Sequence, residues 1–390
     1  MRLNRPVAIR VGALALVGVL VLVIYLLVTA RQDCEQGDSK GNGEPSTEEP
    51  DTAPRFNVKN FGATANDATN DTAAFERAMT EAAKANGVAY VPAPGTYRIS
   101  CATPPNNAHL QVQAGVVLKK YGTAGGPLFN VEGPTDTTFR ENVHIEGVGG
   151  TFTMDLNDAG PETSGIRYRN VRHFSLKNMV CRQNWDNHTQ EAPSSRRTCL
   201  AFLPTTSTST NGVYNHPTDG TFENVHSKES PYGWGLTQFS GGEDLRFYNI
   251  SSKGGVALRL ESFRSKWTPI DNIVVDGVTC TNGHDAVHVN PHNGTHGTIT
   301  VRNVIADSCE SAVRLGNEST LEGSFASDST ISGVTAIPGN RAQVRDPSPG
   351  GHVGAWNIGS SKWSIDNDKP LGYTVRLSHV AGGGLRYRDP

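Results

Sequence analysis

One stretch near the start of the folded region constrains the fold more than any other part of this chain. Between Phe56 and Tyr97 the sequence reads, in order, as a short strand, a Gly turn, a capped helix, a second strand and a Pro-Gly turn. Asn70 or Asp71 caps the helix, and its apolar residues recur every three to four positions on one face: Phe75, Met79 and Ala82 or Ala83. We expect this helix to cover the open end of a stack of parallel strands, whose unpaired edges would otherwise promote aggregation.

A short motif recurs along the rest of the chain and predicts a solenoid. Alternating apolar residues lead to a terminal Asn or Gly at Gly147, Asn178, Asn224, Asn249, Gly277, Asn303 and Gly333. The intervals of 31, 46, 25, 28, 26 and 30 residues fit coils whose strands stack in register while loops of variable length leave the corners. Asn and Gly suit corners where the backbone needs a positive φ, so we expect these residues to be structural.

The segments VKNFGA, NDTAAF and YVPAPGTY of the opening stretch resemble the start of the pectate-lyase and polygalacturonase superfamily. The resemblance implies an all-β, right-handed parallel β-helix over residues 55–390, with an N-terminal capping helix. It implies a scaffold more than a chemistry, because this fold hosts lyases, hydrolases, epimerases and phage adhesins.

The N-terminus predicts export. Residues 11–30 form an unbroken apolar run, long enough to cross about 30 Å of hydrocarbon as a transmembrane helix. Arginines precede this run and acidic residues follow it, so the positive-inside rule places residues 1–10 in the cytoplasm and the rest outside. We interpret the run as a single-pass signal anchor in the cell membrane, whereas cleavage after Ala30 would give a secreted protein. Residues 31–54 lack large apolar side chains and read as an acidic flexible linker.

Charge and residue spacing narrow the range of partners. The formal net charge is −3 and no basic run follows the membrane segment, which argues against a nucleic-acid partner. No spacing resembles a zinc site and no cluster of Asp and Glu suggests Ca²⁺, so we expect no cofactor; bound Ca²⁺ or Na⁺ stays possible but is not indicated. We expect a monomer that binds a polysaccharide and is tied to the membrane by its N-terminal helix.

The six cysteines of an exported chain predict disulfides. Cys181 and Cys199 bracket the loop of the longest interval and form the first candidate pair. Cys280 and Cys309 lie in neighbouring coils, but the alignment of the coils puts Cys280 beside Ala306, so this pair requires the chain to bend back. We expect Cys34, in the linker, to stay free.

Three consecutive coils carry the candidate chemistry. They align as Val256-Ala-Leu-Arg-Leu-Glu261, Asp285-Ala-Val-His-Val-Asn290 and Ser311-Ala-Val-Arg-Leu-Gly316. Strand alternation points Leu258, Val287 and Val313 into the core and the intervening side chains outward onto one face. That face would hold Arg259, Glu261, His288, Asn290, His292, Arg314 and Glu318, bordered by Gln238, with Trp234 and Trp267 as sugar-stacking platforms. Such a row suits an anionic or hydroxyl-rich glycan, and the alternative is a solvated polar face with incidental charge pairing.

The stretch Gly254–Ser262, together with Gln238 and Val289–His292, resembles the central coils of the iota-carrageenase family of glycoside hydrolases. The resemblance implies hydrolysis, with inversion, of β-1,4 links in a sulfated galactan. It implies that Glu261 is the general acid, and that Gln238 and His292 are active-site residues.

One position departs from the family pattern. The family's base is an Asp two residues after the catalytic Glu, where this chain has Phe263. An inverting hydrolase needs two carboxyl groups about 6.5–9.5 Å apart, so the base must come from a neighbouring coil, with Asp285 and Glu318 as the candidates.

Two other classes stay open. A polysaccharide lyase would use a basic residue such as Lys253 or Arg259, although the sequence signature of polygalacturonases is absent and no acidic cluster suggests Ca²⁺. The second class is a non-catalytic, membrane-anchored glycan-binding protein. It is favoured by Phe263, which stands where the family has its catalytic Asp, and by the membrane tether. Our expectation is a glycoside hydrolase acting on an extracellular or cell-envelope polysaccharide, which is bound by Gln238, Arg259, His288, His292, Arg314 and Trp234.

Overall fold

The structure is a computed structural model that describes residues 53–156, 163–183, 198–207, 214–262, 269–292, 294–315 and 323–337. It also gives the backbone of three C-terminal strands, β24 (Trp363–Asp368), β25 (Arg376–Ala381) and β26 (Gly384–Arg388). The predicted cytoplasmic tail, the membrane segment and nearly all of the linker lie outside these residues. Within the described part of the chain, no helix combines the length and the apolar character that crossing a bilayer requires.

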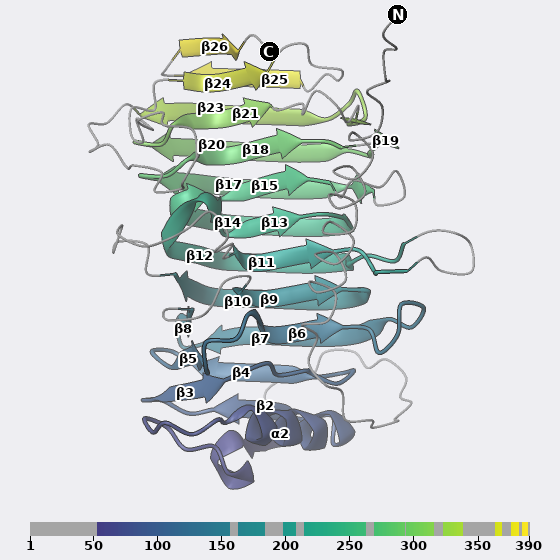
Figure 1. Ribbon diagram of the computed structural model, residues 1–390, viewed down its shortest axis with the longest axis vertical. Coiled ribbons are helices and arrows are strands. Elements are labelled where there is room, and N and C mark those ends of the chain that lie inside the picture. The colour runs from purple at the N-terminus through teal and green to yellow at the C-terminus, as the bar shows by residue number, and fades with distance from the viewer. Residues whose placement is uncertain are drawn as a thin grey trace, which may run out of the picture. The chain divides into compact units, whose positions relative to one another are not determined.

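Parallel strands stack in successive coils and form two long sheets (Figure 1). The first sheet contains β1 (Arg55–Asn57), β2 (Val88–Val91), β3 (Thr96–Ile99), β4 (His109–Gln113), β5 (Val117–Lys120), β7 (Arg140–Val148), β8 (Phe152–Asp155), β10 (Val171–Arg182), β12 (Thr218–Gly235), β14 (Gly242–Val256), β16 (Ile270–Asp271), β17 (Ile273–Thr281), β20 (Ile299–Asp307), β23 (Thr330–Ile337) and β25. The second sheet contains β6 (Gly126–Glu132), β9 (Thr163–Arg169), β11 (Thr198–Leu203), β13 (Thr237–Phe239), β15 (Leu258–Glu261), β18 (Asp285–Asn290), β21 (Ser311–Leu315), β24 and β26. Two short strands, β19 (Gly294–Thr295) and β22 (Gly323–Ser324), pair separately. The predicted all-β solenoid is confirmed, and it matches a parallel β-helix.

A helix covers the N-terminal end of the stack, as the opening stretch predicts. Helix α2 (Thr72–Lys84) follows the short 3-10 helix η1 (Val58–Phe61) and buries Phe75 and Met79 together with three alanines. The Asn70 side chain accepts a hydrogen bond from the Thr72 amide (3.1 Å) at the start of the helix. Asp71 instead accepts hydrogen bonds from the amides of Thr64 and Arg98, so this carboxylate ties the helix start to the first coil.

An asparagine ladder marks one corner of the coils. Asn178, Asn224, Asn249 and Asn303 have φ values of 54°, 52°, 52° and 57°, the left-handed conformation that the repeat predicts. Asn224 donates to the side-chain oxygen of Asn178 (3.1 Å), and Asn249 donates to that of Asn224 (2.7 Å). Gly147 is needed for another reason, because a Cβ atom there would lie 2.6 Å from the carbonyl oxygen of Asn178. These residues are structural, as expected.

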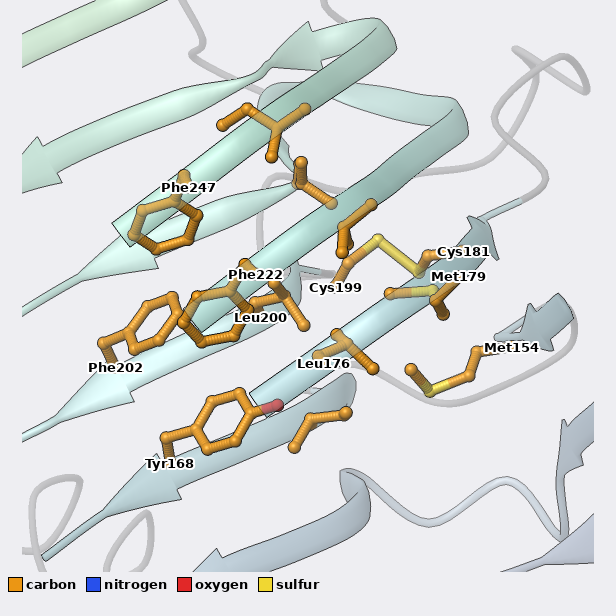
Figure 2. Packing of buried hydrophobic residues seen from close by; sticks show 14 of the residues in the cluster. Met154, Tyr168, Leu176, Met179, Cys181, Cys199, Leu200, Phe202, Phe222 and Phe247 are labelled. Atoms are coloured by element: carbon orange, nitrogen blue, oxygen red, sulfur yellow. A yellow bond between two sulfur atoms is a disulfide. The ribbon is translucent and has the colours of Figure 1, made fainter. Parts of the chain in front are cut away.

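Stacked aromatic rings fill the middle of the core (Figure 2). Tyr168, Phe202 and Phe239 occupy equivalent positions on β9, β11 and β13, with ring centroids 5.3 and 4.4 Å apart. On the facing sheet the rings of Phe222 and Phe247 stack at 4.5 Å. All five side chains are buried. The column on the second sheet continues into Leu260, directly beneath the predicted site.

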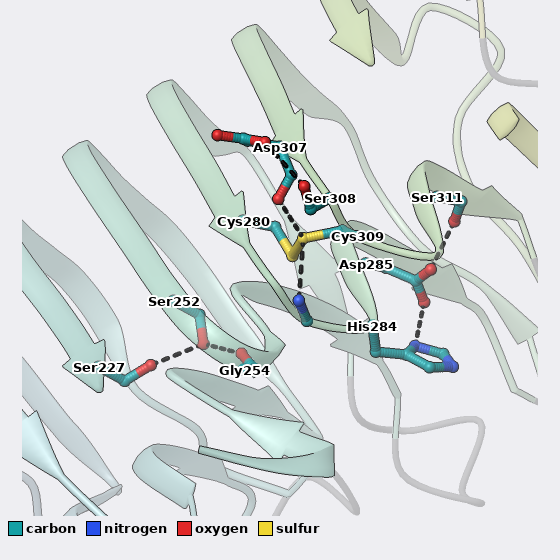
Figure 3. The surroundings of a disulfide bond; sticks show 11 residues. Ser227, Ser252, Gly254, Cys280, His284, Asp285, Asp307, Ser308, Cys309 and Ser311 are labelled. Atoms are coloured by element: carbon teal, nitrogen blue, oxygen red, sulfur yellow. Dashed lines mark hydrogen bonds and ion pairs between the residues drawn. A yellow bond between two sulfur atoms is a disulfide. The ribbon is translucent and has the colours of Figure 1, made fainter. Parts of the chain in front are cut away.

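The two predicted disulfides are present. Cys181 and Cys199 are joined across a sequence separation of 18 residues. Cys280 lies opposite Ala306 in the strand register, as the repeat alignment predicts, and it is nevertheless bonded to Cys309 (Figure 3). The chain bends back after β20 at Ser308, whose φ is 57°. Cys101 is disulfide-bonded as well, and Cys34 lies outside the described residues.

Candidate functional site

The three candidate coils place their strands side by side in the predicted register. Leu258 pairs with Val287 and Val287 with Val313, and all three side chains are buried in the core. On the other face of the same strands, Arg259 is beside His288 and His288 is beside Arg314. The row of polar side chains therefore forms as expected.

Glu261 is the point at which four polar side chains of this face converge. Its Oε2 atom accepts hydrogen bonds from Arg259 (3.1 Å) and from Gln238 (3.2 Å), which comes from β13. Its Oε1 atom lies 3.4 Å from the amide nitrogen of Asn290 and 3.6 Å from Nε2 of His292. Because 22% of the Glu261 side chain stays exposed, this carboxylate can reach a ligand on the face.

The surroundings of Glu261 keep it ionised in the free protein. Burial raises the pKa of its carboxyl, but the adjacent ring of His292, the charge of Arg259 and contributions from His288 and Gln238 together outweigh burial. The net pKa is far below the ordinary value of a Glu. A general acid at this position would therefore need its cationic neighbours to be engaged elsewhere during the reaction.

Two of the predicted binding residues are held in fixed positions. The Arg259 guanidinium lies over the ring of Trp234, 5.3 Å from its centroid, so the predicted stacking platform contacts a cation in the free protein. The Ser262 hydroxyl accepts a hydrogen bond from the amide of His292 (2.6 Å) and donates one to its carbonyl (2.9 Å). The ring of His292 is thereby held against Glu261.

A buried carboxylate lies at the start of β18, next to the exposed end of the row. Asp285 Oδ2 is 2.5 Å from Nδ1 of His284 and 3.2 Å from Nδ1 of His288, while the Ser311 hydroxyl donates to Oδ1. Figure 3 shows Asp285 between His284 and Ser311. Burial raises the pKa of Asp285, but the two imidazoles lower it by more than burial raises it. The net pKa is therefore well below the ordinary value of an Asp.

His288 is much less accessible than an outward-pointing strand residue would suggest. Its side chain is only 8% exposed, and burial lowers its pKa to about 4 against the opposing effect of Asp285. The charges of Arg259 and Arg314 lower this pKa further. His288 is therefore a neutral imidazole near pH 7.

The same cluster is the group of described residues whose ligand atoms are close enough for a metal ion. The ligand atoms of His284, Asp285 and His288 all lie within 4.8 Å of one another. The carboxylate is nevertheless already matched by two imidazoles, and Arg314 Nη1 lies 3.4 Å from Nε2 of His284. This guanidinium would repel a cation, and the close contacts of Asp285 with the two imidazoles are electrostatic contacts without hydrogen-bond geometry.

The remaining predicted residues fall into two groups. Glu318, Phe263 and Trp267 lie outside the described residues. Asp285 begins its strand five residues before Asn290, the neighbour of Glu261, which separates it from Glu261 by about 16 Å along the sheet. This distance and its burial favour an orienting role for Asp285 over that of the base.

Sequence reasoning missed His284, Ser262 and Ser311. His284 directly precedes Asp285 in the sequence, but no periodic signal assigns its side chain to the site. Lys253, considered as the base of a lyase, is exposed on β14 in the other sheet.

Comparisons with known proteins relate the chain to other β-helix proteins. Residues 55–233 match a family model described as rhamnogalacturonase A/epimerase, pectate lyase-like, which ends before the site strands begin. The chain is 28% identical over 271 residues to an iota-carrageenase of Alteromonas macleodii (66% of this chain, 51% of the relative). It is 27% identical over 270 residues to an iota-carrageenase of Zobellia galactanivorans (66% and 52%). The chain thus spans about half the length of the curated relatives it matches.

A solved structure extends the likeness to the fold. An iota-carrageenase complexed to iota-carrageenan fragments superposes with a TM-score of 0.70 at 20% identity, covering 89% of this chain and 95% of that one. The fold defines a pectate-lyase-like parallel β-helix, and its second sheet carries a partly exposed carboxylate among polar side chains. Within that class, the chain resembles the iota-carrageenases.

Proposed function

We propose that the protein is a glycoside hydrolase that cleaves a sulfated galactan or a related anionic glycan. The observation that carries this proposal is the convergence of Gln238, Arg259, Asn290 and His292 on the partly exposed carboxylate of Glu261. The similarity to iota-carrageenases, which occur in the same fold, supports it.

The charges on the face favour an anionic substrate. Arg259 and Arg314 are two strands apart, about 10 Å, with the neutral His288 between them. Two guanidinium groups at this spacing suit sulfate esters on successive sugars, because each can bind an anion with two parallel hydrogen bonds.

A sulfated substrate would also change the protonation of Glu261. Arg259 lowers the pKa of this carboxyl in the free protein. A sulfate bound by Arg259 would compete for that positive charge, and the pKa of Glu261 would rise towards the range in which it can donate a proton. Glu261 is then the acid that protonates the leaving oxygen.

Glycan binding without catalysis is the second candidate. The low pKa values of Glu261 and His288 leave neither group protonated near pH 7 in the free protein, which favours binding over acid catalysis when no sulfate is present.

We also propose that the β-helix is exported, as a monomer, behind the anchor or signal at residues 11–30.

Product analysis tests the proposal. The full chain is incubated with iota-carrageenan and with sulfated, uronic and neutral polysaccharides. We expect new reducing ends without an unsaturated sugar on the sulfated galactan. Ultraviolet-absorbing unsaturated products would contradict the hydrolase in favour of a lyase, and retention of the glycan without cleavage would leave only binding.

A further inference from the structure

The two nitrogens of His288 have different surroundings. Nδ1 is buried 3.2 Å from Asp285 Oδ2, a close contact without hydrogen-bond geometry, whereas Nε2 lies on the other side of the ring and takes no hydrogen bond from the described residues. A carboxylate oxygen carries only lone pairs, so this contact is favourable when Nδ1 holds the proton. A neutral His288 therefore presents the lone pair of Nε2 on the side away from Asp285.

The surroundings of Asp285 favour the tautomer of His288 that carries its proton on Nδ1. The Ser311 hydroxyl donates to its Oδ1 atom, and His284 contacts Oδ2 at 2.5 Å. These partners keep the carboxylate charged although only 1% of its side chain is exposed. A buried, fixed negative charge orients the adjacent imidazole and stabilises the imidazolium that forms when Nε2 accepts a proton.

His288 also lies at a suitable distance from Glu261. It is paired with Arg259, and Glu261 lies two residues further along that strand, beside Asn290. One strand across and two residues along gives a separation of about 8 Å between the two Cβ atoms. In an inverting hydrolase the two catalytic groups themselves are about 6.5–9.5 Å apart, which leaves room for a water molecule. Cβ atoms about 8 Å apart allow the side chains of Glu261 and His288 to reach such a spacing.

We propose that His288, oriented by Asp285, is the base that activates the attacking water. It would stand in for the carboxylate that the resemblance expects at Phe263, and the inference rests on the proposed hydrolase function. The water oxygen bonds to the anomeric carbon while its proton passes to Nε2 of His288. The glycosidic bond breaks, and the leaving oxygen takes the proton of Glu261. His288 is the catalytic residue in this step, and Asp285 is a positioning residue.

The first test needs no substrate. Nitrogen-15 NMR of the full chain at pH 7, with His288→Gln used to assign the signals, should show protonated Nδ1 and unprotonated Nε2 in His288. Asp285→Asn should shift this ring towards a mixture of tautomers. A wild-type ring protonated on Nε2 would overturn the proposal.

The second test measures the reaction on iota-carrageenan. His288→Ala and His288→Gln should lower kcat by about 10²–10⁴-fold without a change in KM, since the base acts in the chemical step. Azide should restore turnover to His288→Ala and give a glycosyl azide of inverted configuration. The matched control is His226→Ala, a partly buried histidine on the other sheet that contacts Ser251 and should leave kcat unchanged.

The outcomes separate the two proposals. If the wild-type protein cleaves none of the glycans, the hydrolase proposal is overturned, and the proposal that His288 is the base is overturned with it. If the wild type is active and His288→Gln keeps the wild-type kcat, the assignment of His288 as the base is overturned while the hydrolase proposal stands. Loss of activity that azide does not restore assigns His288 a structural role, and activity lost to a chelator and restored by Zn²⁺ assigns the cluster to a metal. Either result also overturns the proposal.

Discussion

The two faces of strands β15, β18 and β21 are almost equally buried but differ in what they bury. On the inner face Leu258, Val287 and Val313 are fully inaccessible, and their removal from water explains their position. On the outer face the side chains of Arg259 and His288 are only 13% and 8% exposed. Burial of charge is costly unless the groups are paired, and on the outer face Arg259 is paired with Glu261.

The largest expected effect comes from placing a charge on the inner face. Val287→Asp buries an unpaired carboxylate in the central column, and we expect the domain not to fold. Circular dichroism and thermal melting check this result. Arg314→Gln, on the outer face of the neighbouring strand, should fold, and a folded Val287→Asp would mean that the two faces are interchanged.

A smaller loss of folding stability is expected at acidic pH. The pKa of His288 is about 4 in the folded protein and about 6.5 when unfolded, so between these values the unfolded chain binds more protons. Stability contributed by neutral His288 is present above pH 6.5 and is lost as the pH falls towards 4, by about 3 kcal/mol in total. Urea unfolding at pH 7 and pH 4.5 measures this loss, and His288→Gln should reduce it. An unchanged pH dependence in that variant would show that His288 is not the buried neutral group.

A further effect on stability accompanies a large effect on turnover. Glu261→Gln keeps the size of the side chain but removes the charge that pairs with Arg259, so we expect the domain to fold with an unfolding free energy lowered by about 2 kcal/mol. Turnover should fall by about 10²–10⁴-fold, because the proton donor is lost while glycan binding is kept. Melting temperature, glycan binding and reducing-end release are the three measurements. Glu223→Gln, an exposed residue on the other sheet, is the control, and full activity in Glu261→Gln would rule out the acid role.

Periodicity explains which parts of the molecule could be predicted from the sequence. The two-residue alternation fixes the register of Leu258, Val287 and Val313, and the recurring Asn and Gly fix the corners, so the coils follow from the sequence. Alternation also gives the direction of His288, but it does not say what covers a side chain. The sequence therefore predicts His288 as a surface position that tolerates replacement, and its burial beside Asp285 corrects this.

The site itself depends on contacts that no period encodes. His284 reaches Asp285 from just before its strand, and Cys309 reaches Cys280 only because the chain bends back at Ser308. Such contacts arise where strands end and loops begin. Ser311, by contrast, is the register partner of Asp285 on β21. The proposed base is the least predictable element, because the position expected for it holds Phe263 and the alternatives come from other coils.

The asparagine ladder has a consequence for how such a chain can change its length. The side-chain amides of Asn224 and Asn249 each donate to the asparagine of the preceding coil, and the strands on either side are paired residue by residue. Adding or deleting a whole coil preserves both patterns, whereas inserting one residue within a strand turns every following side chain to the opposite face. The coil is therefore the natural unit for grafting, and whole coils exchanged between relatives should carry the outer face, and the substrate it selects, without disturbing the core.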